Sequence, residues 1–376
     1  MASSFKVRAE YTKYRLNFKF DAGTSRGVLK TKDTFFIRVS SDQFSGVLGY
    51  GEAGPLPQLS TDDVPGFEEK LQLVCRDISG ISVPGTEEGI LDFVSEKVPT
   101  ELPSVRFAME TALLDLLNGG RRRVLKNAFY DDHQSIAING LIWMGTREFM
   151  LEQIRQKLDQ NYNCIKLKIG SIDFEQECGL LEFIRQQYSA DQVTLRVDAN
   201  GAFSAKEALS KLRRLADYGL HSIEQPIKQG QREAMNALCR LSPVPIALDE
   251  ELIGVNDIRE KQSLLREINP QYIILKPTLV GGIQSTREWI ALAEEMGVGW
   301  WMTSALESNI GLNAVAQLTS TYHPNIPQGL GTGQLYHNNV DSPMTIDKGE
   351  IVYDAHRAWG DIGGLFGEGD AETSSA

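Results

Sequence analysis

The sequence predicts an α/β protein, a (β/α)7β TIM-like barrel preceded by an N-terminal α+β capping domain. From about residue 134, short apolar segments alternate with amphipathic ones, which is typical of parallel strands covered by helices. Eight apolar and seven amphipathic segments follow one another, and that number closes most naturally into a barrel. The chain has 376 residues, and a bare barrel needs only about 250, which leaves room for a second domain.

Strands and then helices are predicted before residue 126. Polar and apolar residues alternate over 14–20 and 34–39, which predicts two strands. Glycine-rich segments over 21–27 and 49–57 predict loops, the first too long for a tight hairpin. Apolar residues at helical spacing predict helices over 61–77, 86–97 and 103–117. Such a succession is typical of an α+β domain.

The barrel elements follow in alternation. The predicted strands span 135–141, 164–169, 193–198, 222–225, 245–249, 272–276, 299–304 and, less distinctly, 328–331. The predicted helices span 146–160, 173–188, 204–218, 230–241, 255–267, 284–296 and 310–321. An open doubly wound sheet is the alternative, but no glycine-rich fingerprint follows an early strand, which weakens a dinucleotide-binding interpretation.

These elements divide the chain into four predicted sections. A capping domain over 1–125 precedes a barrel with the catalytic site over 126–333. Residues 334–360 contain short strand-like segments and are predicted to return to the capping domain. Residues 361–376 are rich in glycine and small polar residues, and we expect this tail to be mobile.

Composition argues against several classes of function. The net charge of −12, from 38 basic and 50 acidic side chains, disfavours nucleic acid and acidic membrane surfaces as partners. No run of 18 apolar residues predicts a membrane span, and the first residues carry no secretory signal. The four cysteines form no CxxC pair, and we expect them to be buried, reduced thiols. We therefore expect a cytoplasmic protein without a nucleic-acid or membrane partner, as a single chain or as a homo-oligomer.

One charged side chain stands near the end of each of five successive predicted strands. They are Lys168, Asp198, Glu224, Asp249 and Lys276, spaced 25 to 30 residues apart, which is about the length of one βα unit. The carboxyl ends of the strands surround the active-site mouth of a barrel. A single such charge is usually a helix cap or a salt bridge, but five at this regular spacing favour a catalytic site.

Three carboxylates from neighbouring strands would repel each other if they met unpaired. A divalent cation removes that cost, and an all-oxygen ligand set favours Mg²⁺, with Mn²⁺ or Ca²⁺ as alternatives. Lys166 shares a face with Lys168, since side chains two apart on a strand point the same way. The flanking lysines could act as acid and base where the cation and neighbouring ammonium groups favour their neutral forms.

At these residues the sequence resembles the muconate-lactonizing subgroup of the enolase superfamily. The matching segments, which lie in a likeness covering nearly the whole chain, are Lys166-Leu-Lys168, Asp198-Ala-Asn200, Glu224-Gln-Pro226, Leu248-Asp249-Glu250 and Lys276-Pro277. The resemblance implies that Asp198, Glu224 and Asp249 bind Mg²⁺. It also implies that Lys168 removes a proton α to a substrate carboxylate, forming an enediolate. Lys276 would act from the opposite face, as a second acid or base or as a cation that stabilises the enediolate.

The resemblance implies supporting roles for the residues beside these. Lys166 would favour the neutral form of Lys168 and contact the substrate carboxylate. Asn200 and Glu250 would support the site through hydrogen bonds, although ordinary hydrogen bonding at strand ends is an equally good interpretation. Glu251 is expected to be exposed.

Within the subgroup, residues 303–311 resemble the Ser-x-x-Glu-Ser-x-x-Gly stretch of the o-succinylbenzoate synthase family, and 329–333 also resemble that family. The implied reaction is loss of water from a succinyl-hydroxycyclohexadiene carboxylate in menaquinone biosynthesis. Ser304 and backbone groups near Leu306 and Gly311 would hold the succinyl tail, and Arg26 would close over the substrate. Ser304 and Ser308 are equally typical of helix N-caps, and Arg26 of a solvated loop residue.

Other activities share the same lysines and carboxylates. N-succinylamino acid racemase, dipeptide epimerase and muconate lactonization remain open. Dipeptide epimerases typically carry an Asp-x-Asp pair beyond the seventh or eighth strand, and residues 304–308 contain none. An inactive barrel that only binds a ligand would need one of the five charged residues replaced, and all are present. A metal-dependent aldolase would not need lysines on both sides of the cation.

Overall fold

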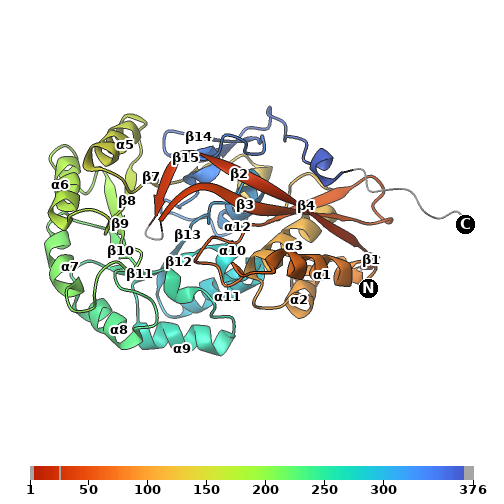
Figure 1. Cartoon of the computed structure of the whole chain (residues 1–376), viewed down its shortest axis with the longest axis horizontal. Helices are drawn as coiled ribbons and strands as arrows, with labels where there is room; N and C mark the ends of the chain where they lie inside the picture. Colours follow the sequence, from red (N-terminus) through yellow and green to blue (C-terminus); the bar gives the residue numbers. More distant parts are fainter. Residues whose placement is uncertain (1–3, 25–26, 368–376) are drawn as a thin grey trace, which may run out of the picture.

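The computed structural model describes residues 4–24 and 27–367. Figure 1 shows an arc of helices around a curled sheet on the left, and a smaller unit of antiparallel strands and helices on the right. The predicted fold class is confirmed, because a parallel barrel sheet and a separate antiparallel N-terminal sheet are both present. The boundaries proposed for the four sections remain predictions.

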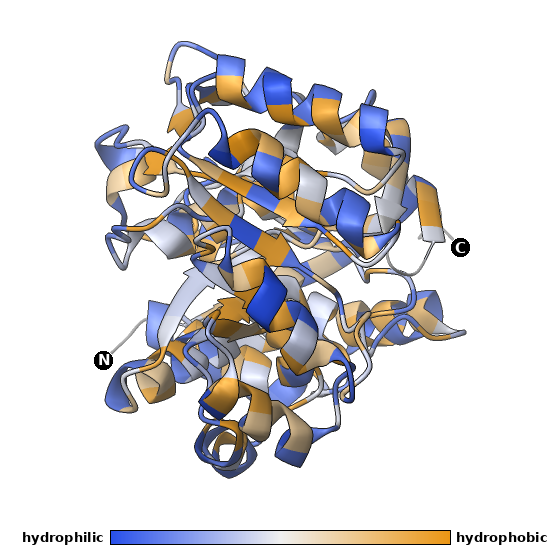
Figure 2. Ribbon diagram, turned by 90° about the vertical axis from the view of Figure 1, so that its left-hand side faces the viewer, coloured by the Kyte–Doolittle hydropathy of each residue, from blue (hydrophilic) through white to orange (hydrophobic). Residues whose placement is uncertain are grey.

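Seven parallel strands form the barrel sheet in sequence order. They are β7 (Gly140–Ile142), β8 (Cys164–Lys168), β9 (Thr194–Asp198), β10 (Ser222–Glu224), β11 (Ile246–Leu248), β12 (Tyr272–Leu275) and β13 (Gly299–Met302). The covering helices are α5 (Arg147–Asp159), α6 (Phe174–Arg185), α7 (Ala208–Ala216), α8 (Arg232–Leu241), α9 (Ile258–Ile268), α11 (Gly282–Glu295) and α12 (Asn309–Ser320). Short turns of helix also follow two strands, η1 (Glu250–Leu252) after β11 and α10 (Pro277–Val280) after β12. Figure 2 shows these helices banded in polar and apolar colours, as amphipathic helices on a buried sheet should be.

The eighth strand predicted near 328–331 is present only as two parallel bridges. Gln328 pairs with Ile138 on one side, and Gly329 pairs with Thr303 on the other. Backbone hydrogen bonds from Asn139 N to Gln328 O (2.9 Å) and from Gly329 N to Met302 O (2.7 Å) join both edges. These bridges close the sheet into a barrel, although the chain turns at once into η2 (Gly331–Gln334) and leaves no longer strand.

The capping unit contains β1 (Ser4–Lys6), β2 (Arg8–Thr24), β3 (Gly27–Ser40), β4 (Leu48–Ala53), β5 (Ser82–Pro84), α1 (Phe67–Ile78), α2 (Glu87–Lys97) and α3 (Pro103–Leu117). The loop predicted over 21–27 is wrong, because β2 continues to Thr24 and pairs with Gly27. The hairpin reaches the barrel mouth, where Gly23 pairs with Met144 and the rings of Phe20 and Trp143 lie 5.6 Å apart (Figure 1).

The loop predicted over 49–57 is also wrong over its first half, which is strand β4. Its glycines serve packing rather than a turn. A Cβ atom at Gly51 would lie 1.9 Å from the carbonyl oxygen of Ala108, and one at Gly49 would lie 2.1 Å from that of Ala112. Both contacts are far below van der Waals distance, so only glycine lets α3 lie directly on β4.

The segment after the barrel runs between both units. Lys19 N donates to Leu335 O and His337 N to Asn17 O, both at 2.9 Å, so 335–337 lie along β2. Farther on, β14 (Met344–Asp347) and β15 (Glu350–Tyr353) form a hairpin that pairs with β6 (Ile136–Ala137), just before the barrel. A short helical segment, η3 (Gly363–Phe366), begins the tail that was predicted to be mobile, and residues 368–376 of that tail lie outside the described residues.

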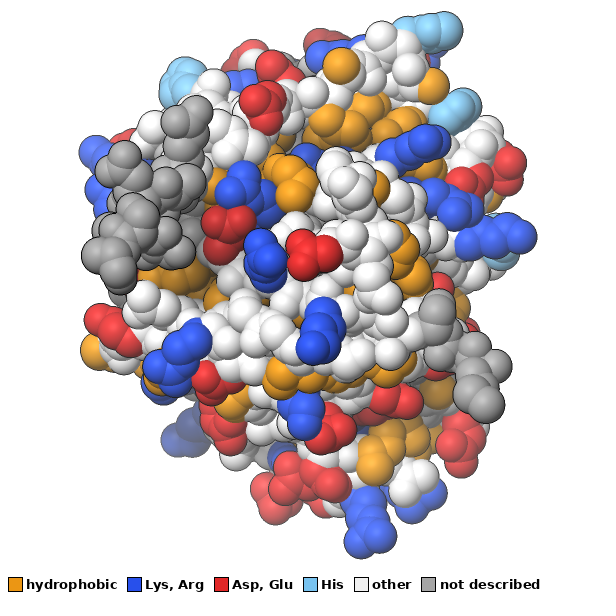
Figure 3. All heavy atoms as spheres, turned by 90° about the vertical axis from the view of Figure 1, so that its right-hand side faces the viewer, with side chains coloured by type: hydrophobic (Ala, Val, Ile, Leu, Met, Phe, Trp, Pro, Cys, Tyr) orange, Lys and Arg blue, Asp and Glu red, His pale blue; other side chains and the backbone are white. Residues whose placement is uncertain are grey.

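The surface and the helices agree with the composition. On the face shown in Figure 3, basic and acidic side chains are interspersed over a largely polar surface. Over residues 4–24 and 27–367, no helix is long and apolar enough to cross a membrane. The four cysteines are free and buried, as predicted.

A buried glutamate anchors the capping unit to the barrel. Glu110 of α3 accepts hydrogen bonds from Ile283 N (2.5 Å) and Gln284 N (3.3 Å), the first turn of α11. A carboxylate suits this position because the backbone N–H groups of a helix N-terminus are unsatisfied and partly positive. Burial nevertheless raises the pKa of Glu110 to about 8 against the opposing effect of these hydrogen bonds.

Glu110 should make stability fall as pH rises. Between its ordinary pKa of 4.5 and about 8, the folded carboxyl is protonated while the unfolded one is ionised. The stabilisation is therefore full below pH 4.5 and is lost as pH rises through 8, by at most about 1.4 kcal/mol per pH unit. Glu110→Gln should flatten this part of the curve of unfolding free energy against pH, measured by urea denaturation from pH 5 to 9. Parallel curves for the two proteins would contradict the assignment.

Candidate active site

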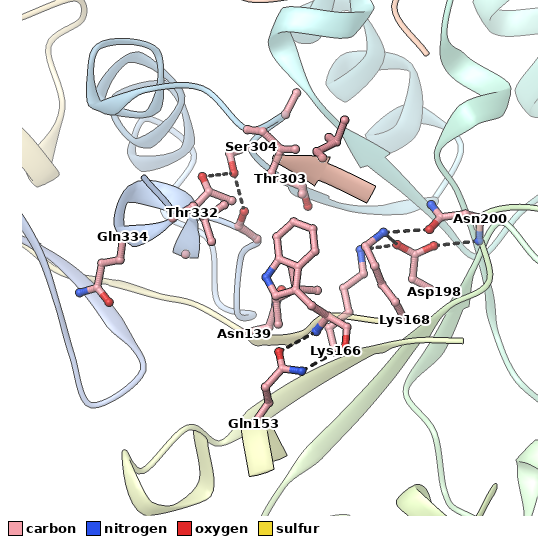
Figure 4. A pocket seen from close by; sticks show the side chains of 18 of the residues that line it. Asn139, Gln153, Lys166, Lys168, Asp198, Asn200, Thr303, Ser304, Thr332 and Gln334 are labelled. Atoms are coloured by element: carbon pink, nitrogen blue, oxygen red, sulfur yellow. Dashed lines mark hydrogen bonds and ion pairs between the residues drawn. The ribbon is translucent and has the colours of Figure 1, made fainter. Parts of the chain in front are cut away.

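A cavity of about 390 Å³ opens at the carboxyl ends of the barrel strands, beneath the β2–β3 hairpin. Five of the residues predicted for catalysis, metal binding or support of the site line it together: Lys166, Lys168, Asp198, Asn200 and Lys276. The remaining walls are mainly apolar and come from both units, with Phe20 and Leu29 from the hairpin and Trp143, Leu306 and Leu335 from the barrel side. Figure 4 shows Lys166, Lys168 and Asp198 on one side of this space and Ser304 and Thr332 on the other.

The charged residues alternate in sign through the site. Lys166 Nζ lies 2.5 Å from Glu224 Oε2 and 3.1 Å from Asp198 Oδ2. Lys276 Nζ pairs with Asp249 Oδ2 and lies 3.8 Å from Glu224 Oε1. Each of these two ammonium groups therefore lies between two carboxylates. Lys168 Nζ lies 3.2 Å from Asp198 Oδ2 and donates to Asn200 Oδ1 at 2.8 Å.

These pairs set the protonation of the site. Burial lowers the pKa of Lys276, but the Asp249 and Glu224 carboxylates outweigh burial and raise it, and Asp198 and Glu224 do the same for Lys166. Burial raises the pKa of Asp198, but three nearby lysines outweigh that effect and lower it. Burial and the two neighbouring carboxylates raise the pKa of Glu224 to about 8. In this pairing the ammonium forms of Lys166 and Lys276 are favoured, and the predicted shift of the flanking lysines toward their neutral forms, which depends on a bound cation, stays a prediction.

The structure also differs from the prediction that three carboxylates meet around one cation. Over residues 4–24 and 27–367, no group of three His, Cys, Asp or Glu side chains is close enough to hold a metal ion. The physical reason is that the ammonium groups of Lys166 and Lys276 lie between the carboxylates and neutralise them.

The residues present nevertheless fit a hard divalent cation. All three acidic side chains are buried, their donors are oxygens, and Glu224 Oε1 is buried without a hydrogen-bond partner. A cation that displaces the two ammonium groups would satisfy that oxygen and offset the repulsion that raises the pKa of Glu224.

Asn200 and Glu250 form part of this site. Asn200 has a left-handed backbone (φ 42°), donates from its backbone N–H to Asp198 Oδ1 at 3.0 Å, and donates from Nδ2 to Glu250 Oε1 at 2.9 Å. Asn200 therefore orients both the carboxylate of Asp198 and the ammonium group of Lys168. Glu251, predicted to be exposed, is buried, because it accepts from Gln225 Nε2 at 3.2 Å and from Gly230 N at 2.9 Å.

Of the four residues predicted to bind the substrate, two line the cavity, one does not, and one lies outside the described residues. Ser304 and Leu306 line the cavity, with Ser304 Oγ 2.6 Å from Thr332 Oγ1. Gly311 does not line it and lies in the first turn of α12, where its N–H donates to Glu52 Oε2 at 2.9 Å. This placement does not support contact between Gly311 and substrate. Arg26 lies outside the described residues.

Two of the polar cavity residues that sequence reasoning missed have a buried atom without a hydrogen-bond partner. Asn139 Oδ1 and Thr303 Oγ1 are buried and have no hydrogen-bond partner, so both atoms are available to a ligand. Asn139 interrupts the apolar residues inside the strand predicted over 135–141, and that interruption was a usable signal. Thr303 adjoins Ser304 but belongs to the strand by its pattern, so nothing in its local sequence distinguishes it.

The barrel, the capping unit and the five charged residues at the strand ends together define one class of protein. Residues 150–359 match the family model described as Enolase C-terminal domain-like. The o-succinylbenzoate synthase of Desulfotalea psychrophila is 48% identical over 364 residues, which cover 91% of this chain and 98% of that protein. The crystal structure of MenC from the same organism superposes with a TM-score of 0.81 at 42% identity, over 92% of this chain and 99% of that one. The dipeptide epimerase of Enterococcus faecalis, complexed with Mg and a dipeptide, shares the fold at 19% identity, with a TM-score of 0.78 over 97% and 99% of the two chains.

This chain belongs to the enolase superfamily and, within it, to the o-succinylbenzoate synthase family. The resemblance stated from its sequence motifs is thereby confirmed, and the chain is an enzyme of that superfamily.

Proposed function

We propose that the chain is a carbon–oxygen lyase that converts 2-succinyl-6-hydroxy-2,4-cyclohexadiene-1-carboxylate into o-succinylbenzoate, a step of menaquinone biosynthesis. The observation that carries the proposal is that Lys168 and Lys276 line one cavity beside Asp198, in a chain 48% identical to an o-succinylbenzoate synthase. A lysine amine that lines the cavity can act as general base toward a proton α to a bound carboxylate.

We propose that Asp198, Glu224 and Asp249 hold Mg²⁺, as their donor set suggests and as a structure of the same fold complexed with Mg supports. When bound, the cation supplies positive charge to the substrate carboxylate, whose second negative charge builds up as the α-carbon is deprotonated. Lys166, buried between Asp198 and Glu224, would add a fixed positive charge at the same end of the cavity.

In the proposed reaction, the neutral amine of Lys168 takes the α-proton, and the C–H electron pair moves into the carboxylate to form an enediolate. The enediolate then collapses, a ring double bond forms, and the C–O bond to the hydroxyl group breaks. Lys168, now an ammonium, returns its proton to the departing hydroxide, so that water and the aromatic ring are the products. Asn200 and Asp198 hold Lys168 Nζ in place for both transfers.

The rest of the cavity suits a ring with a polar tail. Phe20, Trp143 and Leu306 provide apolar surface that excludes water from the ring and the lysines. Ser304 and the unpartnered Thr303 hydroxyl lie on the opposite wall and can donate hydrogen bonds to the tail. Lys276, which also lines the cavity, would stabilise the enediolate as a cation.

The test is a direct assay of the purified chain with Mg²⁺ and the cyclohexadiene substrate, followed by the absorbance of the aromatic product. N-succinyl amino acids are assayed beside it, because a racemase would use both lysines alternately. We expect turnover of the cyclohexadiene substrate. Racemisation of N-succinyl amino acids with no dehydration would overturn the proposal and leave family membership intact.

A further inference from the structure

Two fully buried carboxylates lie outside the proposed catalytic and metal-binding residues, at the contact between the capping unit and the barrel. Glu52 belongs to β4 of the capping unit, and Glu307 lies in the segment between β13 and α12. Lys32 of β3 is buried near them and attracts both charges. The proposed reaction uses none of these three residues.

Glu52 binds the beginning of a barrel helix. It accepts hydrogen bonds from Ser308 N at 2.8 Å, from Ser308 Oγ at 2.5 Å and from Gly311 N at 2.9 Å. A carboxylate is favoured there because the first turn of α12 presents unsatisfied N–H groups. Thr34 of the neighbouring strand donates to Glu52 Oε1 at 2.8 Å and fixes its orientation. A residue of the capping unit therefore binds the N-terminus of a barrel helix, and that helix begins shortly after residues 303–306, which form one wall of the cavity.

Glu307 holds the same wall from the other side. It accepts from Ala305 N at 2.7 Å and from Thr278 Oγ1 at 2.5 Å. Thr278 lies in α10, two residues after Lys276, so Glu307 joins the wall to the segment that carries a catalytic lysine.

The wall itself is strained. Thr303, Ser304, Ala305 and Leu306 all line the cavity, and Leu306 has a φ of 63°, in the left-handed region. A non-glycine residue there is strained and keeps its conformation only where the surroundings impose it. The hydrogen bonds of Glu52 and Glu307 flank Leu306 on both sides, and Tyr336 OH donates to its carbonyl at 2.7 Å.

Gly311 makes this arrangement possible. A Cβ atom at Gly311 would lie 2.8 Å from Glu307 Cβ and 3.0 Å from Glu52 Oε2. Glycine at this position therefore lets the Glu52 carboxylate reach the helix and leaves room for the side chain of Glu307, which is a packing role.

We propose that Glu52 is a positioning residue for the reaction, because its hydrogen bonds to Ser308 and Gly311 hold the strained cavity wall 303–306 in its active shape. The docking of the cap thereby sets the alignment of substrate against Lys168.

The experiment compares Glu52→Gln and Ser308→Ala with the wild type, using full-length protein loaded with Mg²⁺. Glu52→Gln removes the negative charge and one acceptor oxygen, and Ser308→Ala removes only the hydroxyl donor. We expect Glu52→Gln to lower kcat/KM about 10- to 100-fold, the scale of a substrate misplaced by about 1 Å. Ser308→Ala should lower it by less. The affinity for Mg²⁺, measured by calorimetric titration, should stay within about twofold of wild type.

Glu110→Gln is the matched control. It alters the other buried glutamate of the cap that binds a barrel helix, and, among the described residues, α11 contributes none to the cavity. This variant should change Tm and leave kcat/KM within about twofold. The double variant Glu52→Gln/Ser308→Ala should lose little more activity than Glu52→Gln alone, because both remove one contact.

Two outcomes overturn the proposal. In the first, Glu52→Gln changes Tm as Glu110→Gln does, while its kcat/KM stays within twofold of wild type. In the second, the losses of kcat/KM in the two single variants add fully in the double variant. If Glu52→Gln does not fold, unchanged kcat/KM in Ser308→Ala is the overturning result. The positioning role of Glu52 rests on the proposed function only through the choice of substrate for the assay. A wild type without activity on that substrate contradicts the function, whereas an active wild type with an equally active Glu52→Gln contradicts only the positioning role.

Discussion

Lys168→Ala should lower kcat/KM by about 10³-fold or more and should abolish exchange of the α-proton of a bound carboxylate for deuterium. Lys168 lines the cavity and is held by Asp198 and Asn200, so its amine is fixed where a base is needed. Loss of a positioned general base typically costs 10²- to 10⁴-fold. The exchange is measured by mass spectrometry of the ligand recovered from deuterium oxide.

Lys168→Arg is the control for charge. It keeps a positive charge beside Asp198 but cannot give up a proton at neutral pH. We expect it to be as inactive as Lys168→Ala while it keeps Mg²⁺ affinity near that of the wild type. Exchange that persists in either variant would assign the base to another residue.

Glu224→Gln should lower the affinity for Mg²⁺ at least about 100-fold and reduce turnover in proportion. Glu224 is the central carboxylate of the three, in contact with both Lys166 and Lys276, and its Oε1 has no hydrogen-bond partner. An amide supplies a neutral oxygen in place of a charged one, and hard cations bind such a ligand more weakly. Calorimetric titration with Mg²⁺ measures the effect directly.

Glu233→Gln makes the same chemical change on the exposed surface of α8 and should leave Mg²⁺ affinity unchanged. Equal affinities for wild type, Glu224→Gln and Glu233→Gln would show that the cation binds elsewhere, and the proposed site would be wrong.

The barrel and its charged ring were predictable because each depends on a local pattern repeated at a fixed interval. Each of these βα units has one charged residue near the end of its strand. Because parallel strands align, as Asp198 and Glu224 do in register, these residues come to surround the barrel mouth. No side-chain contact has to be known in advance. The eighth strand was weakly predicted for the opposite reason, since only Gln328 and Gly329 bridge the edges and so short a segment has no measurable period.

What the sequence could not predict depends on contacts between distant segments. Glycines at 49 and 51 were interpreted as a loop because nothing local shows that α3 packs against them. Glu52 and Glu110 carry no local signal for the helices that they bind, which lie about 260 and about 170 residues away along the chain, respectively. The pairing of Lys166 and Lys276 with the carboxylates, in place of a meeting of three acids, is likewise a matter of side-chain geometry.

A crystal structure of the chain with Mg²⁺ and o-succinylbenzoate would test the central claim most directly. We predict the cation bound by oxygens of Asp198, Glu224 and Asp249, the ammonium groups of Lys166 and Lys276 moved from between them, and Lys168 Nζ facing the ring carbon that bears the carboxylate. Carboxylates still paired with those ammonium groups at saturating Mg²⁺, with the ligand bound outside this cavity, would contradict the account.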